Sequence, residues 1–188
     1  MAQWRREVRS HPTPDAPWLT LTETAPALVI TCMDRHLPLE RLLQFRPTLT
    51  VWRTADGLIP PATAASSETR QRLADLIEQR RIGDIWLVGH SRCSAVPTGG
   101  VRPVVDPTEP FIERVRQRLR QAAQERSEAL ARLTRQAEQL ALEAWIGPAI
   151  ASGRMRVVSW FRLDETGEFL IQREPTQPFE PLLLGGLR

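Results

Sequence analysis

Three residue types are missing from this 188-residue sequence, which contains no lysine, no tyrosine and no asparagine. All 25 basic residues are therefore arginines, and they hold the isoelectric point near 9.9 although the formal net charge is only +3. Between residues 114 and 139 the arginines are interleaved with glutamate and glutamine. That pattern is typical of a solvated helix face, whereas a nucleic-acid surface would gather arginines and aromatic residues on one side. We therefore expect no nucleic-acid partner.

Long apolar runs and abundant cysteines are also missing. No stretch approaches the roughly 18 consecutive apolar residues that a membrane-spanning helix needs, and the N-terminus lacks the apolar segment of a secretory signal. The two cysteines are Cys32 and Cys93. We expect a reducing, cytoplasmic compartment, where a disulfide is improbable. Metal binding, catalysis and ordinary core packing remain as roles for the two thiols.

The first half of the chain alternates between two kinds of hydrophobic pattern. A continuous apolar run covers residues 27–32, strands are also expected at 48–54 and 84–90, and helical spacing covers residues 37–45 and 68–81. The order strand–helix–strand–helix–strand predicts a parallel sheet with helices packed against it.

The second half adds a long amphipathic helix and a strand pair. The helix is expected over residues 111–145, with a break near 125–127. Strands at 155–163 and 168–174 are joined by an Asp-Glu-Thr-Gly turn. We predict an α/β fold with a mostly parallel sheet, about four parallel strands plus an antiparallel edge strand, flanked by helices.

The predicted domain occupies residues 27–174. Residues 1–26 contain four prolines and are expected to form an N-terminal arm. Residues 175–188 form an apolar, proline-punctuated C-terminal tail, which we expect to dock on another surface such as a partner subunit.

Both cysteines lie where strands of the predicted sheet end. Cys32 closes the first strand, His90 closes the third, and Cys93 follows His90 by three residues. Functional groups collect at the carboxyl ends of the strands in open α/β sheets. Two thiolates and an imidazole favour zinc, and three protein ligands leave a fourth, catalytic position open. Taken singly, a His-x-x-Cys spacing arises by chance, and a buried cysteine is usually a small hydrophobe.

The segments that carry these residues resemble the β-class carbonic anhydrases. Residues 32–36 (CMDRH) resemble the family's Cys-x-Asp-x-Arg segment, and residues 51–57 (VWRTADG) its Arg-Asn-Ala-Gly segment. Residues 88–96 (VGHSRCSAV) resemble Gly-His-x-x-Cys-Gly, and 154–169 the terminal strand pair. The resemblance spans Leu28 to Phe169. It implies Zn²⁺ on Cys32, His90 and Cys93, and a homodimer or larger homo-oligomer with exchanged arms.

The same resemblance implies a set of catalytic residues, with departures. Asp34 matches the family aspartate, but the family's arginine partner is His36 here, and Arg35 fills the position between them. The candidate catalytic residues are therefore Asp34, Arg35 and His36. An Asp34 without an ion-pair partner becomes a candidate fourth zinc ligand.

The second and third segments also depart from the family pattern. Thr54 and Asp56 replace Asn and Gly, and Ser94 replaces the Gly after the second cysteine. Arg53 is retained and is the candidate substrate-binding residue. It would either face bicarbonate or donate structural hydrogen bonds to the loop, and the geometry of a guanidinium favours the structural role.

The resemblance implies interconversion of CO2 and bicarbonate through a zinc-bound hydroxide. Two thiolates neutralise the charge of zinc, so its water should lose a proton less readily than on a three-histidine site, where the pKa is about 7, and activity should rise with pH. Two alternatives stay open: a catalytically impaired zinc-binding homologue with a structural or assembly role, and a CS2 or COS hydrolase relative. A bacterial protein near a CO2-fixing compartment is conceivable, although no residue indicates it.

Overall fold

The computed structural model describes residues 26–34, 48–60, 67–93 and 110–182. The helix expected at 37–45 and nearly all of the N-terminal arm lie outside these ranges. Among the described residues, no helix is both long enough and apolar enough to cross a membrane. The elements are β1 (Ala27–Cys32), β2 (Leu49–Thr54), α4 (Ser67–Arg80), β3 (Asp84–His90), α5 (Phe111–Leu142), α6 (Gly147–Ala151), β4 (Arg156–Arg162), β5 (Phe169–Gln172) and β6 (Glu180–Pro181).

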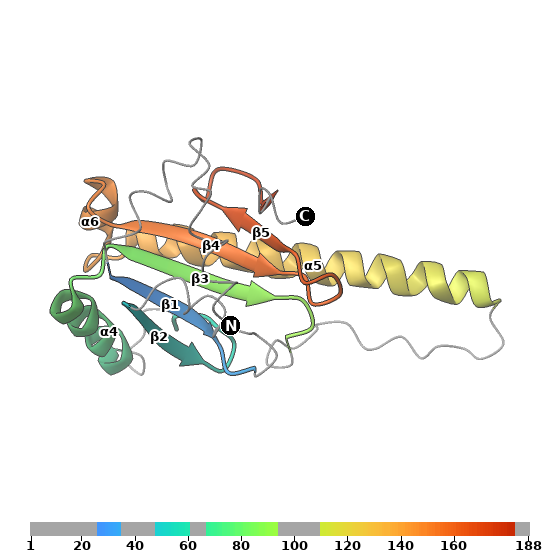
Figure 1. Cartoon of the computed structure of the whole chain (residues 1–188), viewed down its shortest axis with the longest axis horizontal. Helices are drawn as coiled ribbons and strands as arrows, with labels where there is room; N and C mark the ends of the chain where they lie inside the picture. Colours follow the sequence, from blue (N-terminus) through green and yellow to red (C-terminus); the bar gives the residue numbers. More distant parts are fainter. Residues whose placement is uncertain (1–25, 35–47, 61–66, 94–109, 183–188) are drawn as a thin grey trace, which may run out of the picture.

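One six-stranded sheet, in the order β2-β1-β3-β4-β5-β6, organises the molecule (Figure 1). Strands β2, β1, β3 and β4 pair in parallel, and β5 pairs antiparallel to β4. The predicted fold class is therefore confirmed. The short strand β6, from the expected tail, adds an antiparallel edge to β5 of the same chain.

Strand β1 is buried on both of its faces. Leu28 and Ile30 belong to one hydrophobic cluster, and Ala27 and Val29 belong to a second, so alternate side chains fill opposite sides of the sheet. All four are at most 1% exposed. This explains why the strand reads as a continuous apolar run, as expected for a central parallel strand. Buried side chains of α4 and α5 pack into the cluster that contains Leu28.

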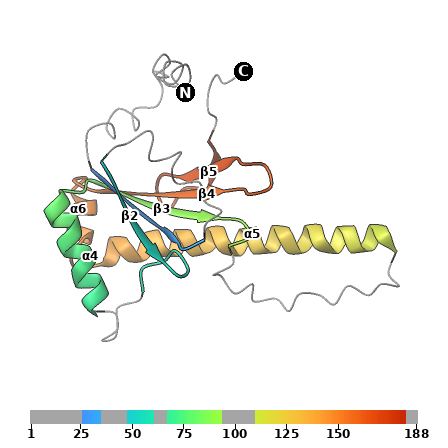
Figure 2. The same ribbon diagram turned by 60° about the horizontal axis from the view of Figure 1, so that its bottom comes forward.

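Helix α5 is unbroken over 32 residues, so the expected break near residues 125–127 is wrong. Side-chain hydrogen bonds one turn apart, from Gln121 to Glu125 and from Gln124 to Glu128, support the helix through this region. The C-terminal half of α5 packs on the sheet through Leu133, Ala137 and Leu140. The N-terminal half extends past the ends of the strands (Figures 1 and 2).

Candidate metal centre

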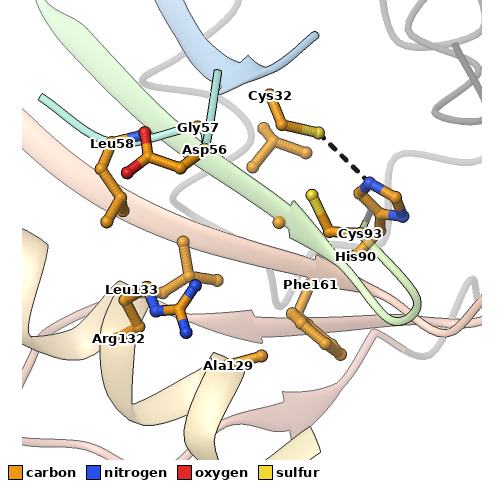
Figure 3. A pocket seen from close by; sticks show the side chains of 12 residues that line it. Cys32, Asp56, Gly57, Leu58, His90, Cys93, Ala129, Arg132, Leu133 and Phe161 are labelled. Atoms are coloured by element: carbon orange, nitrogen blue, oxygen red, sulfur yellow. Dashed lines mark hydrogen bonds between the residues drawn. The ribbon is translucent and has the colours of Figure 1, made fainter. Parts of the chain in front are cut away.

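Two neighbouring strands deliver the candidate ligands to one edge of the sheet. In the parallel pairing of β1 with β3, Thr31 lies opposite Val88, so Cys32 and His90 emerge at the same carboxyl edge. The turn after β3 passes through Arg92, whose φ of 62° bends the chain and brings Cys93 back. The donor atoms of Cys32, His90 and Cys93 all lie within 4.8 Å of one another (Figure 3).

The separation and chemistry of these donors fit a zinc ion. Zinc–sulfur bonds of about 2.3 Å and zinc–nitrogen bonds of about 2.0–2.1 Å place tetrahedral donor atoms roughly 3.5–3.8 Å apart. The Cys32 Sγ lies 3.2 Å from the His90 Nε2, so shifts of a few tenths of an ångström would admit the ion. Cys32 and His90 are 2% and 3% exposed, whereas Cys93 is half-buried. These three residues could hold zinc and leave a fourth position open.

The far side of the His90 ring is fixed by two acceptors. Its Nδ1 lies 2.8 Å from the Asp164 Oδ2 and 2.9 Å from the Ser91 carbonyl oxygen. Because both partners only accept, Nδ1 carries the proton, and the lone pair of Nε2 faces the thiols. Arg162 donates to the other oxygen of Asp164 and holds the carboxylate in place. This arrangement fixes the orientation of the ring as a ligand.

Asp164 is a site residue that the sequence pattern did not reveal. The pattern predicts only a turn at residues 164–167, between β4 and β5. The usable signal is topological: β4 pairs in parallel with β3, with Arg162 opposite His90, so the turn after β4 must leave the sheet at the ligand edge.

Burial controls the protonation of Cys32 in the absence of a cation. It raises the pKa of this thiol from 9.0 to about 11, and the neighbouring Cys93 acts in the same direction. The backbone N–H of Asp34 opposes the rise but does not cancel it. At neutral pH the thiol keeps its proton until a positive charge arrives, as is typical of a buried thiolate ligand.

Asp34 borders the site. Its Oδ2 lies 3.9 Å from the His90 Nε2, and its side chain is only 6% exposed. It is not among the three residues whose donor atoms all lie within 4.8 Å of one another. Arg35 and His36 fall outside the described residues, so their catalytic roles, and that of Asp34 as a fourth ligand, stay predictions.

The loop after β2 closes over Cys32. The Arg53 Nη1 donates to the Cys32 carbonyl oxygen at 2.9 Å, and Asp56 forms an antiparallel bridge with Cys32. Gly57 has a φ of 77°, and a Cβ there would lie 2.9 Å from the Cys32 backbone nitrogen. The close approach therefore requires glycine at this position, which the sequence pattern indicated only as part of a loop. Substrate binding by Arg53 stays a prediction.

Helix α5 forms a further wall of the pocket that contains the ligands. Ala129, Arg132 and Leu133 line the pocket together with Cys32, Gly57, His90, Cys93 and Phe161 (Figure 3). Buried Gln136 on the same helix accepts a hydrogen bond from the Ile59 backbone N–H at 3.0 Å and ties α5 to the loop after β2. The charge pattern predicted a solvated helix face and gave no sign of this contribution.

Fold and site together define an α/β protein with a candidate Cys2His metal centre at the carboxyl edge of a mostly parallel sheet. A family model described as carbonic anhydrase matches residues 27–169. The chain belongs to this family, the β-carbonic anhydrases, as the resemblance implied.

Several solved β-carbonic anhydrases share the fold at low sequence identity. CcaA is 18% identical with a TM-score of 0.60, the match covering 97% of this chain and 99% of CcaA. CafD of the fungus Aspergillus fumigatus is 15% identical with a TM-score of 0.58, over 88% of this chain and 95% of that one. A Sordaria macrospora enzyme, one of two described as tetrameric, is 16% identical with a TM-score of 0.55, over 98% and 93%. No curated protein sequence matches.

Proposed function

We propose that this protein is a zinc-dependent carbonic anhydrase that interconverts CO2 and bicarbonate. The observation that carries the proposal is the convergence of Cys32, His90 and Cys93 within 4.8 Å, in a chain whose residues 27–169 match the family. Two sulfur donors and one nitrogen donor leave one tetrahedral position for solvent, which is the ligand pattern of catalytic zinc.

Each residue of the site has a role in this reaction. Bound zinc supplies a Lewis acid that activates water for attack on CO2. Asp164 holds the Nδ1 proton of His90 and keeps Nε2 aimed at the ion. Asp34, whose Oδ2 lies 3.9 Å from the His90 Nε2, would orient the reacting water and accept its proton. Leu133 and Phe161 give the pocket an apolar wall that suits an uncharged substrate.

Metal analysis combined with stopped-flow CO2 hydration tests the proposal. The purified chain should hold stoichiometric zinc and catalyse hydration, with the rate rising from neutral to alkaline pH. His90→Gln should lose both zinc and activity, and the control His11→Gln, in the N-terminal arm, should keep both. Stoichiometric zinc without hydration at any pH would contradict the proposal. The impaired homologue with an assembly role, or a CS2 or COS hydrolase, would then account for the site.

We also propose that the chain assembles with copies of itself. The projecting half of α5 exposes large apolar side chains, with Phe111 at 72%, Ile112 at 63% and Leu119 at 65%. Their spacing places them on one side of the helix. The Sordaria macrospora relatives are described as tetrameric. A second copy would cover the apolar side.

Light scattering after size exclusion tests self-association. The wild-type chain should elute as a multiple of its 21.3 kDa mass. Leu119→Glu should lower that mass, because it buries a charge in the proposed contact. Ala131→Glu introduces the same residue at an exposed position on the other side of α5 and should leave the mass unchanged. A monomeric wild-type chain would overturn this proposal.

A further inference from the structure

Arg132 on α5 is half-buried and lines the same pocket as Cys32, His90 and Cys93. Figure 3 shows its side chain extending from the helix into this pocket, across from the candidate ligands. Within the part of the chain that the structure describes, no hydrogen bond or ion pair engages its guanidinium. Asp56 also lines the pocket, but its Oδ1 accepts from the Thr54 hydroxyl and from the Leu58 backbone N–H. A guanidinium aimed into a pocket and not paired with a carboxylate is suited to bind an anion.

Three arginines on the strands of the sheet already have hydrogen-bond partners. Arg156 binds Asp84, and Arg162 binds Asp164. Arg53, the candidate substrate-binding residue from the sequence, donates a hydrogen bond from Nη1 to the Cys32 carbonyl oxygen. Arg132 therefore offers its donors to the pocket at a point where these arginines do not.

Close packing between β3 and α5 places Arg132 at the pocket. A Cβ at Gly89, directly before His90, would lie 3.0 Å from the Leu133 Cδ1 and 3.3 Å from Phe161. Glycine thus lets α5 approach the end of β3 without an intervening side chain. Arg132, adjacent to Leu133, is carried to the rim of the ligand site by this approach.

We propose that Arg132 binds the bicarbonate anion in this site, an inference that rests on the proposed function. Two thiolates balance the two charges of zinc, so the metal centre alone exerts little net attraction on an anion. The guanidinium supplies the missing positive charge, and its planar fork matches two oxygens of bicarbonate. Partial burial strengthens this attraction relative to water.

Anion titration of the zinc-loaded, full-length protein tests the inference. Isothermal calorimetry at constant ionic strength would measure dissociation constants for bicarbonate and for unreactive nitrate. Arg132→Gln should raise both constants about tenfold or more, since it removes a charge-assisted hydrogen bond. Arg135→Gln, an exposed site three residues along the same helix, is the matched control and should leave both constants unchanged.

Zinc content is measured in every variant. Wild-type affinity in zinc-loaded Arg132→Gln would overturn the inference, and so would equal weakening by Arg135→Gln. If Arg132→Gln loses zinc, anion binding by Arg132→Lys is compared with anion binding by the control Arg135→Lys. Weaker binding in the former alone supports a role for the planar fork, and equal binding overturns it.

These outcomes separate the inference from the proposed function. Binding of nitrate that depends on Arg132, without any CO2 hydration, would leave the anion site standing and remove the proposed activity. CO2 hydration combined with anion binding that is unchanged in Arg132→Gln would support the proposed activity and overturn the anion site at Arg132.

Discussion

The hydrogen bond between Asp164 and His90 makes a sharp prediction about metal affinity. In Asp164→Asn, one side-chain oxygen can still accept from the His90 Nδ1. The amide NH2 must then face Arg162, which donates to the second oxygen of Asp164 in the wild-type chain. Two donors would face each other, so either the contact with Arg162 or the contact with His90 is lost. Asn therefore keeps the shape of the side chain but not the fixed orientation of the imidazole.

The magnitude follows from the kind of bond involved. A hydrogen bond to a charged group contributes about 1.5–3 kcal/mol, which corresponds to roughly 10–150-fold in an equilibrium constant. Loss of such a carboxylate partner typically weakens metal binding about 10–100-fold. We expect zinc affinity to decrease by a factor within that range, because the imidazole of His90 must become ordered when zinc binds.

Competition with a fluorescent chelator at neutral pH measures the affinity directly. Glu165→Gln is the matched control, because Glu165 binds Ser91 and Arg92 and not His90. Its affinity should stay within a factor of about two of wild type, since exposed contacts of this kind contribute little. Equal zinc affinities for Asp164→Asn, Glu165→Gln and the wild-type chain, with the fold intact by circular dichroism, would refute a positioning role for Asp164.

Four further predictions concern two effects of the Cys32 proton, the backbone at Gly57, and the residues after Asp34. Because burial raises the pKa of Cys32 to about 11, zinc must displace its proton at neutral pH. Apparent zinc affinity should rise about tenfold per pH unit for each proton released, and pH-independent affinity would contradict this. The metal-free chain should also lose stability as pH rises from 9.0 towards 11, because the folded state holds the proton more tightly. Gly57→Ala should lower the free energy of unfolding by about 1–3 kcal/mol. Gly167→Ala is the control and should lower it less, because Gly167 has a similar φ of 74° but no atom within 4 Å of the added Cβ. Equal losses in denaturant titrations would show that the contact with Cys32 is unimportant. His36→Arg combined with Arg35→Ala should raise the CO2 hydration rate if the replacement of the family arginine by His36 limits activity, and an unchanged rate would point instead to the loop after β2.

The parallel core was predictable because local sequence and burial agree there. Residues 27–32 form a nearly continuous apolar run and residues 84–90 contain the apolar run 85–88, and both segments become strands buried on two faces. The prediction of a break in α5 was wrong because the polar residues Glu125 and Ser127 were taken to indicate an interruption of the helix. In the structure, hydrogen bonds between side chains one turn apart carry the helix through them. Propensity alone does not register such pairs.

The candidate ligands were predictable because Cys32 and His90 end neighbouring strands and Cys93 follows His90 by only three residues, so spacing along the chain largely determines their positions in space. Asp164, Gly57 and Arg132 were not, because their roles depend on register and packing between distant elements. Asp164 reaches His90 across 74 residues only because β4 pairs with β3.

The two arginines of the pocket region show the same distinction in chemical terms. Sequence similarity singles out Arg53, but its guanidinium supports the carbonyl group of a ligand residue. Arg132 stands in a charge-rich helix where nothing local separates it from its neighbours, yet it reaches the pocket because Gly89 leaves room for α5. The position of the Arg132 charge in the pocket therefore depends on Gly89, because a glycine on β3 leaves space for α5. Gly89 itself lines the pocket, and a side chain at this position would also push Leu133 and the neighbouring Arg132 away from it.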